Sequence, residues 1–307
     1  MRYLCIGEPL AEFTNPPDLP HQFNRNAGGD TLTSAIYLAR LCGGAQVGYL
    51  SRLGDDAMSL FIRDFIAVEG LVDLSATESG GRLGLSMIST DATGERSFTY
   101  WRDQSPARRL FQSAEEIAIL DQSDVIVLSG ITLAVLYPEG RAALVAALRR
   151  RAAEGALIVL DTNYRARLWP DATSAAAAIS EVAAIAGLVL PSMDDMAACF
   201  GTPTPAAAMA LLQNLTSAEV VLTTGGDEVL YCAKGDSCVT TLPLPPKRAA
   251  RDTTGAGDSF NAGWLHARAN GATVADAVAL AAALAAEVVC HPGAVIPKSA
   301  MADFMHS

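Results

Sequence analysis

From residue 124 onward, short apolar runs alternate with alanine-rich stretches of helical character. The apolar runs fall at 124–130, 156–161, 187–192 and 218–224, and the helical stretches between them include 138–153 and 172–186. Alternation of this kind is typical of a mostly parallel sheet that helices cover on both faces. The chain is therefore predicted to be an α/β protein, with 228–233 and 238–244 as a strand pair near the sheet edge.

Residues 83–101 interrupt the alternation. Two β-prone runs flank "TDATGE", which is a turn signal, so we expect a hairpin there. Joined by part of 8–25, this hairpin would form a small β flap. The chain of 307 residues shows no linker and no repeat. We expect one domain, 1–307, with a lid from about 8–25 and 82–103 inserted in it.

Charge and cysteine usage exclude several function classes. The net charge of −11 argues against nucleic acid or an anionic membrane as the partner. The six cysteines are scattered and form no C-x-x-C, which argues against a disulfide framework or zinc site and favours a reducing cytoplasm. The first residues, "MRYLCIGEPL", turn polar too early for a signal peptide, and charges interrupt the longest apolar stretches. We therefore expect a cytoplasmic protein without a membrane span.

The stretch "RDTTGAGDSF" places Gly255, Ala256 and Gly257 directly before Asp258 and an apolar run. A helix is expected to begin there, and its first amide N–H groups have no partner within the helix. Together with the helix dipole they attract an anion, and the small residues let the backbone approach it closely. The pattern predicts a phosphate cradle at this helix start.

Asp258 would lie in the first turn of that helix, and its ordinary pKa of about 3.9 would leave it ionised at neutral pH. A carboxylate beside a phosphate cradle repels phosphate, unless a hydroxyl lies between them and loses its proton to the acid. The alternative is an aspartate that only stabilises the helix dipole. The local pattern alone favours neither interpretation.

Other phosphate and nucleophile motifs fail. None of the three lysines follows a glycine, as a P-loop requires, and Phe260 replaces the third glycine of the dinucleotide pattern G-x-G-x-x-G. A serine hydrolase with Ser259 as nucleophile needs a histidine base. His266 and His291 have no acid at a suggestive spacing before them.

Two longer stretches, "DTTGAGDSFNAG" and "NAGGDTLTSAIYLARL", resemble the signatures of the ribokinase-like (PfkB) carbohydrate kinases. "VGYLSRLGDDAMS", "TDATGERSFTYWR", "LSGITLAVL" and "DTNYRARLW" are similar to the branch that acts on 2-keto-3-deoxygluconate. The matches run from about residue 26 to 262. The resemblance implies a ribokinase-like three-layer α/β/α sandwich with a mostly parallel central sheet and a small β flap. It also implies transfer of phosphate from ATP, with Mg²⁺, to the C6 hydroxyl of 2-dehydro-3-deoxy-D-gluconate, which is the same sugar acid.

The resemblance also implies roles for individual residues. Asp258 would be the catalytic base, and the amides of Gly255, Ala256 and Gly257 would form the anion hole. The sugar acid would contact Gly29, Asp30, Tyr100, Arg102 and Arg165. ATP would lie along Ser192, Thr223, Gly225, Gly226, Gly255, Gly257, Gly293 and Ala294. Asp195 would hold magnesium through water. The flaps of relatives often pair between subunits, so a homo-oligomer through the flap is expected.

Residue chemistry agrees with the sugar-acid site. Tyr100 and Arg102 are two apart on an expected strand and so share a face. Arg102 and Arg165 each offer a planar fork to a carboxylate. The alternative for an isolated arginine is a solvated surface charge. Asp30 has an alternative role as a cap of the helix that follows it.

Some positions depart from the family pattern. Thr33 stands where many members carry asparagine, and Ser86 where close relatives carry tyrosine. An N-x-x-E element linked to magnesium reads Ser192 to Asp195 here, and Thr224 replaces a residue that is often charged. Two alternatives therefore stay open: another sugar kinase of the family, of the fructokinase or ribokinase type, or a non-catalytic sugar-binding protein on this scaffold.

Overall fold

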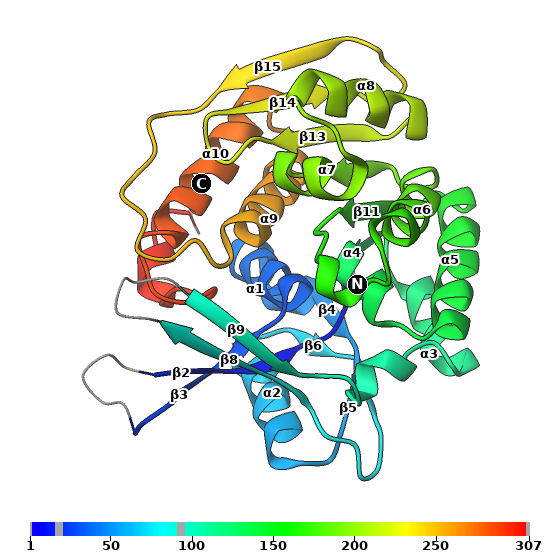
Figure 1. Ribbon diagram of the computed structural model, residues 1–307, viewed down its shortest axis with the longest axis vertical. Helices are drawn as coiled ribbons and strands as arrows, with labels where there is room; N and C mark the ends of the chain where they lie inside the picture. The colour runs from blue at the N-terminus through cyan, green and yellow to red at the C-terminus, as the bar shows by residue number, and fades with distance from the viewer. Residues whose placement is uncertain (1, 16–20, 91–95, 305–307) are drawn as a thin grey trace.

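The computed structural model describes residues 2–15, 21–90 and 96–304, and within them nine strands form the main sheet (Figure 1). Their order is β15 (Val239–Pro243), β14 (Glu228–Cys232), β13 (Glu219–Thr223), β12 (Leu188–Leu190), β11 (Leu157–Asp161), β10 (Val125–Ser129), β1 (Tyr3–Ile6), β4 (Val47–Leu50) and β6 (Val72–Asp73). All neighbours from β6 to β13 pair in parallel, whereas β14 and β15 are antiparallel at the edge. The predicted α/β class and the edge pair are confirmed.

The central strands are apolar on both faces because each face carries its own core. In β10, Val127 packs into one hydrophobic cluster, while Ile126 and Leu128 pack into the other. In β11, Val159 and Leu160 divide in the same way. This two-sided burial explains the near-continuous aliphatic runs of the sequence.

Helices cover both faces of the sheet and complete the three layers. One core takes side chains from α1 (Asp30–Cys42), α2 (Ala57–Val68), α9 (Ala256–Ala269) and α10 (Val274–Val288). The other takes them from α4 (Gly130–Val135), α5 (Pro138–Ala153), α6 (Ala172–Ala183), α7 (Met193–Phe200) and α8 (Pro205–Leu215). Shorter elements are α3 (Ala114–Ala118), η1 (Gly44–Gln46), η2 (Pro106–Arg109), η3 (Ile119–Gln122), η4 (Ala166–Leu168) and η5 (Lys298–Met301). None of the helices in the described ranges is long and apolar enough to cross a membrane.

A second sheet contains most of the segments that we predicted as a lid, and it lies below α1 and α9 in Figure 1. We keep the name lid for this sheet. Its strand order is β3 (Asn24–Gly28), β2 (Leu10–Thr14), β8 (Gly84–Thr90) and β9 (Arg96–Trp101). β8 and β9 pair antiparallel as the expected hairpin, and β2 joins them in parallel. Most of the "TDATGE" turn falls at 91–95, outside the described residues. Two further short strands, β5 (Arg52–Leu53) and β7 (Ala76–Thr77), pair separately.

Candidate active site

Three chain segments bring polar side chains together beside the carboxyl end of β11. This strand ends at Asp161, α1 begins at Asp30, and α9 carries Asp258 in its first turn. Asp30 and Asp161 lie close enough to act on the charge of Asp258. Ligands of open α/β sheets bind at this edge, outside the carboxyl ends of the strands. The fold therefore places the predicted base where a ligand is expected.

The start of α9 depends on a close backbone approach. Gly255 caps the helix with φ of 81°, in the left-handed region, and a Cβ there would lie 2.6 Å from the carbonyl oxygen of Ala294. Only glycine fits both conditions. Ser259 N donates to Gly255 O at 2.9 Å, which is the i−4 hydrogen bond that the cap residue accepts. The Ala256 N–H instead donates to Thr253 O over 3.3 Å, a long bond that an anion could replace.

Asp252 fixes the predicted nucleotide loop against this helix start. Its Oδ2 accepts from Gly293 N at 2.6 Å, and its Oδ1 accepts from Thr254 N at 3.0 Å. Tyr37 Oη donates to Ala294 O at 2.8 Å from the other side. Gly293 and Ala294 are thus brought beside the predicted anion hole. The sequence pattern did not identify Asp252, although this residue opens the "DTTGAGD" stretch.

The environment of Asp258 raises its pKa well above the ordinary value. Burial is the main cause, and the negative charges of Asp30 and Asp161 add to it, while Arg165 acts in the opposite direction. The ordinary pKa that we assumed from the sequence therefore does not hold. A carboxyl with a raised pKa is a stronger base once it is deprotonated, as general base catalysis near neutral pH requires.

Asp161 is the centre of a hydrogen-bond network that the sequence pattern did not indicate. Its Oδ2 accepts from Asn261 Nδ2 at 2.9 Å, and its Oδ1 accepts from Asn163 N at 3.1 Å. Asn163, which has a φ of 22°, donates its Nδ2 to Asp30 Oδ2 at 2.8 Å. The network connects β11 to both α9 and Asp30. An acid at the end of a buried strand, "ALIVLD", was the available signal.

The predicted sugar-binding residues lie on three elements. Gly29 caps α1 directly before Asp30. Tyr100 is 42% exposed on β9, and the charges of Arg102 and Arg165 both act on its hydroxyl. Arg165 precedes η4 with a side chain that is 58% exposed, and its Nη1 is 3.6 Å from Asp195 Oδ1.

Arg102 differs from Arg165 because it already has a partner. It lies one residue beyond β9 and is buried, and its Nε donates to Glu8 Oε2 at 2.8 Å. Glu8 is itself buried. The fork that we expected to bind a substrate carboxylate is thus partly engaged by the protein.

The predicted nucleotide residues lie on two neighbouring strand ends. Ser192 caps α7 and forms an isolated parallel bridge with Thr223, the last residue of β13. Gly225 and Gly226 follow in the turn to β14, both with positive φ. These four residues thus form one continuous surface along the end of the sheet.

Asp195, the predicted magnesium residue, is anchored by the protein. Its Oδ2 accepts from Thr162 Oγ1 at 2.9 Å and its Oδ1 from Tyr164 N at 3.0 Å, and burial raises its pKa. The part of the chain that the structure describes holds no group of three or more histidine, cysteine, aspartate or glutamate residues suited to a metal. Mg²⁺ usually keeps several waters and uses one or two carboxylates, so a single anchored aspartate fits contact through water.

Comparison with known proteins gives the family. The model of the pfkB family carbohydrate kinases matches residues 3–301, and the chain belongs to this family. It is 36% identical over 304 residues to 2-dehydro-3-deoxygluconokinase of Dickeya dadantii, covering 96% of this chain and 97% of that one. It is 28% identical over 297 residues to a fructokinase of Klebsiella pneumoniae, covering 96% and 94%. A solved structure of fructokinase with bound ATP from Xylella fastidiosa superposes with a TM-score of 0.81 at 24% identity, over 97% of this chain and 94% of that one.

The network around Asp161 predicts a pH effect. If Asp258 is the general base, activity would need its deprotonated form, so kcat/KM should fall as the pH drops through its raised pKa. Asp161→Asn removes one of the negative charges that raise this pKa. The acidic limb of a kcat/KM profile, measured by coupled ADP release, should therefore move to lower pH.

The matched control is Asp171→Asn, at an exposed aspartate that caps α6. Asparagine is an equally good cap, so the profile of this variant should overlay the wild type. An acidic limb that stays in place, or moves to higher pH, in Asp161→Asn would contradict the electrostatic role of Asp161.

Proposed function

We propose that this protein is an ATP-dependent kinase of 2-dehydro-3-deoxy-D-gluconate that forms the 6-phosphate. The observation that carries the proposal is the position of Asp258 at the cradle-like start of α9, in a chain 36% identical to a 2-dehydro-3-deoxygluconokinase over nearly its full length. The fructokinase of Klebsiella pneumoniae, at 28% identity, is a more distant relative.

In the proposed reaction, the C6 hydroxyl attacks the γ-phosphorus of ATP and passes its proton to Asp258. The first-turn amides of α9, at 255–258, would stabilise the negative charge on the transferring group, together with the helix dipole. The lid would exclude water from the site, because water would otherwise compete as the phosphate acceptor.

The nucleotide would lie along the surface from Ser192 and Thr223 to the loop at 293–294, which Asp252 holds beside Gly255. Asp195 would hold Mg²⁺ through water. When bound, the ion neutralises charge on the phosphates. The site otherwise carries several carboxylates, so this neutralisation supports binding of an anionic nucleotide. A cytoplasmic location remains a prediction from the sequence.

The sugar acid would lie between Asp30, Tyr100 and Arg165, with its carboxylate near the two arginines. Asn163 holds one oxygen of Asp30, which leaves the other for a sugar hydroxyl. A second candidate, a kinase of a neutral sugar, is favoured by Ser86. This residue pairs with Tyr100 across β8 and β9, and its buried hydroxyl has no hydrogen-bond partner among the described residues.

The two candidates are separated by a coupled ADP-release assay with MgATP and either 2-keto-3-deoxygluconate or fructose. We expect kcat/KM to be about a hundredfold or more higher for the keto acid, because a neutral sugar has no carboxylate to accept hydrogen bonds from Arg102 and Arg165. Arg165→Ala should reduce turnover of the keto acid more than turnover of fructose. Preference for fructose would reject the proposed substrate, and turnover of neither would favour a binding protein.

The base is tested by Asp258→Asn, which keeps the size of the side chain. Loss of a general base should reduce kcat by about a hundredfold to ten-thousandfold, with little change in ATP affinity measured by calorimetry. Asp276→Asn is the matched control, since Asp276 also lies in the first turn of a helix, α10. If kcat of Asp258→Asn is reduced no more than kcat of Asp276→Asn, Asp258 is not the base and only stabilises its helix dipole.

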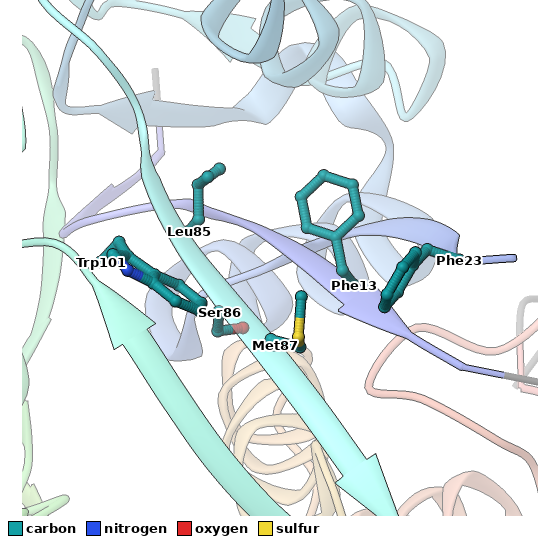
Figure 2. A pocket seen from close by; sticks show the side chains of 6 residues that line it. All are labelled: Phe13, Phe23, Leu85, Ser86, Met87 and Trp101. Carbon is teal, nitrogen blue, oxygen red and sulfur yellow. The ribbon is translucent and has the colours of Figure 1, made fainter. Parts of the chain in front are cut away.

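We further propose that the protein forms a homo-oligomer through the outer face of the lid. The apolar side chains on this face are Phe13, Phe23, Leu85, Met87 and Trp101, which with Ser86 line a hollow of about 460 Å³ (Figure 2). Phe23 and Trp101 are 47% and 55% exposed. Clustered exposed aromatic residues are typical of protein interfaces.

This assembly is tested by sedimentation velocity. We expect the wild type to sediment as a dimer, and Trp101→Arg to sediment as a monomer, because the new charge would be buried without a partner. The control is Val239→Arg, at an exposed position of the edge strand β15 far from the lid (Figure 1). A monomeric wild type at micromolar concentration would contradict the proposal.

A further inference from the structure

Glu8 and Arg102 form a buried ion pair where the lid joins the rest of the molecule. Glu8 lies in the short connection from β1 to β2, and Arg102 directly follows β9. The two residues are 2% and 9% exposed. The Nε and Nη2 atoms of Arg102 both donate to Oε2 of Glu8. The pair thus connects the start of β2 to the end of β9, where these lid strands join the rest of the molecule.

The other two lid strands, β3 and β8, also join the rest of the molecule beside this pair. Gly29, which follows β3, packs so closely that a Cβ there would lie 2.6 Å from Glu8 O. Gly84, the first residue of β8, would place a Cβ 3.0 Å from Glu8 Oε1 and 3.2 Å from Arg102 Cβ. All four lid strands therefore meet around the ion pair. We call the set Glu8, Gly29, Gly84 and Arg102 the lid base.

Stability alone does not account for the pair. Burying two charges costs desolvation energy that their attraction only partly repays. In addition, Oε1 of Glu8 is buried without a hydrogen-bond partner in the described part of the chain. An unsatisfied buried acceptor is destabilising. Features that weaken the fold in this way are expected where function needs them.

The pair also fixes the direction of the guanidinium group. Two donors bound to one oxygen hold the plane of Arg102, and its Cζ lies 5.6 Å from the centroid of the Tyr100 ring. Glu8 engages Nε and Nη2, so Nη1 is the edge that it leaves for another ligand. Tyr100 is half exposed, and the charges of Glu12 and Arg165 act on it as they act on Asp258. This places Tyr100 toward the proposed sugar site.

We propose that Glu8 is a positioning residue for the acceptor substrate: it holds Arg102 at the lid base so that Nη1 faces the substrate carboxylate. This inference rests on the proposed function, which supplies a substrate with a carboxylate. Glu8 itself contacts no substrate and acts through Arg102. Its effect should therefore appear in the binding of the sugar acid and not in the binding of ATP.

The chain offers a matched control in a second buried pair, Arg40 and Glu69. Their Nε–Oε2 and Nη2–Oε1 distances are both 2.9 Å, and their side chains are 5% and 6% exposed. This pair joins the last turn of α1 to the end of α2, at the opposite end of α1 from Asp30. Removing Glu69 leaves a buried arginine without its partner in the same way, away from the lid base.

The experiment compares Glu8→Ala, Glu8→Gln and Glu69→Ala with the wild type, by steady-state kinetics and by thermal unfolding. In Glu8→Ala the KM for 2-keto-3-deoxygluconate should rise about tenfold to a hundredfold, because Arg102 loses its position. The KM for ATP should stay near the wild-type value. Glu8→Gln should restore most of the affinity, since its amide oxygen can replace Oε2 as the acceptor. Glu69→Ala should lower Tm as Glu8→Ala does, with no change in the KM for 2-keto-3-deoxygluconate.

An unchanged KM for the keto acid in Glu8→Ala, or an equal rise in Glu69→Ala, would overturn the inference. If Glu8→Ala does not fold, Glu8→Asp takes its place in the experiment. This variant keeps the charge but shortens the side chain by one methylene, and the same rise in the KM for the keto acid is expected. An unchanged KM in Glu8→Asp would then also overturn it. The wild-type comparison of keto acid with fructose is measured first, so failure of the proposed function is seen separately from failure of the role of Glu8.

Discussion

The close approach of Gly255 to Ala294 is the constraint on which the site depends. It lets α9 begin directly against the loop at 293–294, and Asp252 secures the contact with hydrogen bonds from Gly293 N and Thr254 N. Any side chain at 255 would push the loop and the helix apart. The predicted anion hole, the predicted nucleotide loop and Asp258 therefore depend on a single position without a Cβ.

Electrostatics explain why the proposed site would need both its arginines and its lid. Asp30 and Asp161 surround Asp258 with like charge and raise its pKa, which suits a base but opposes the binding of anions. Arg165 offsets part of this charge, while Arg102 is largely balanced by Glu8. An anionic substrate would thus bind through directed hydrogen bonds more than through net attraction. Directed bonds require fixed donors, and the lid base supplies that rigidity to Arg102.

The sequence predicted what depends on local pattern. Strand and helix alternation gave the parallel sheet, and the glycine stretch before Asp258 located the helix start at the carboxyl end of the strands. The network of Asp161 could not be predicted in the same way, because its members lie far apart in the sequence. Asn261 is 100 residues from Asp161, and Asp30 is 133 residues from Asn163, through which it joins the network. The partner of Arg102 lies 94 residues before it. Only the fold decides which of several acids meets which donor.

The lid shows how one pair of strands serves two surfaces. In β8 and β9, Ser86 and Tyr100 are paired on the face toward the proposed sugar site, and Leu85 and Trp101 are paired on the opposite face. Because side chains alternate along a strand, the register that presents Tyr100 to the substrate also exposes Trp101 outside. A partner subunit that covers Trp101 would hold this register in place. Assembly and substrate recognition would then be coupled through the lid.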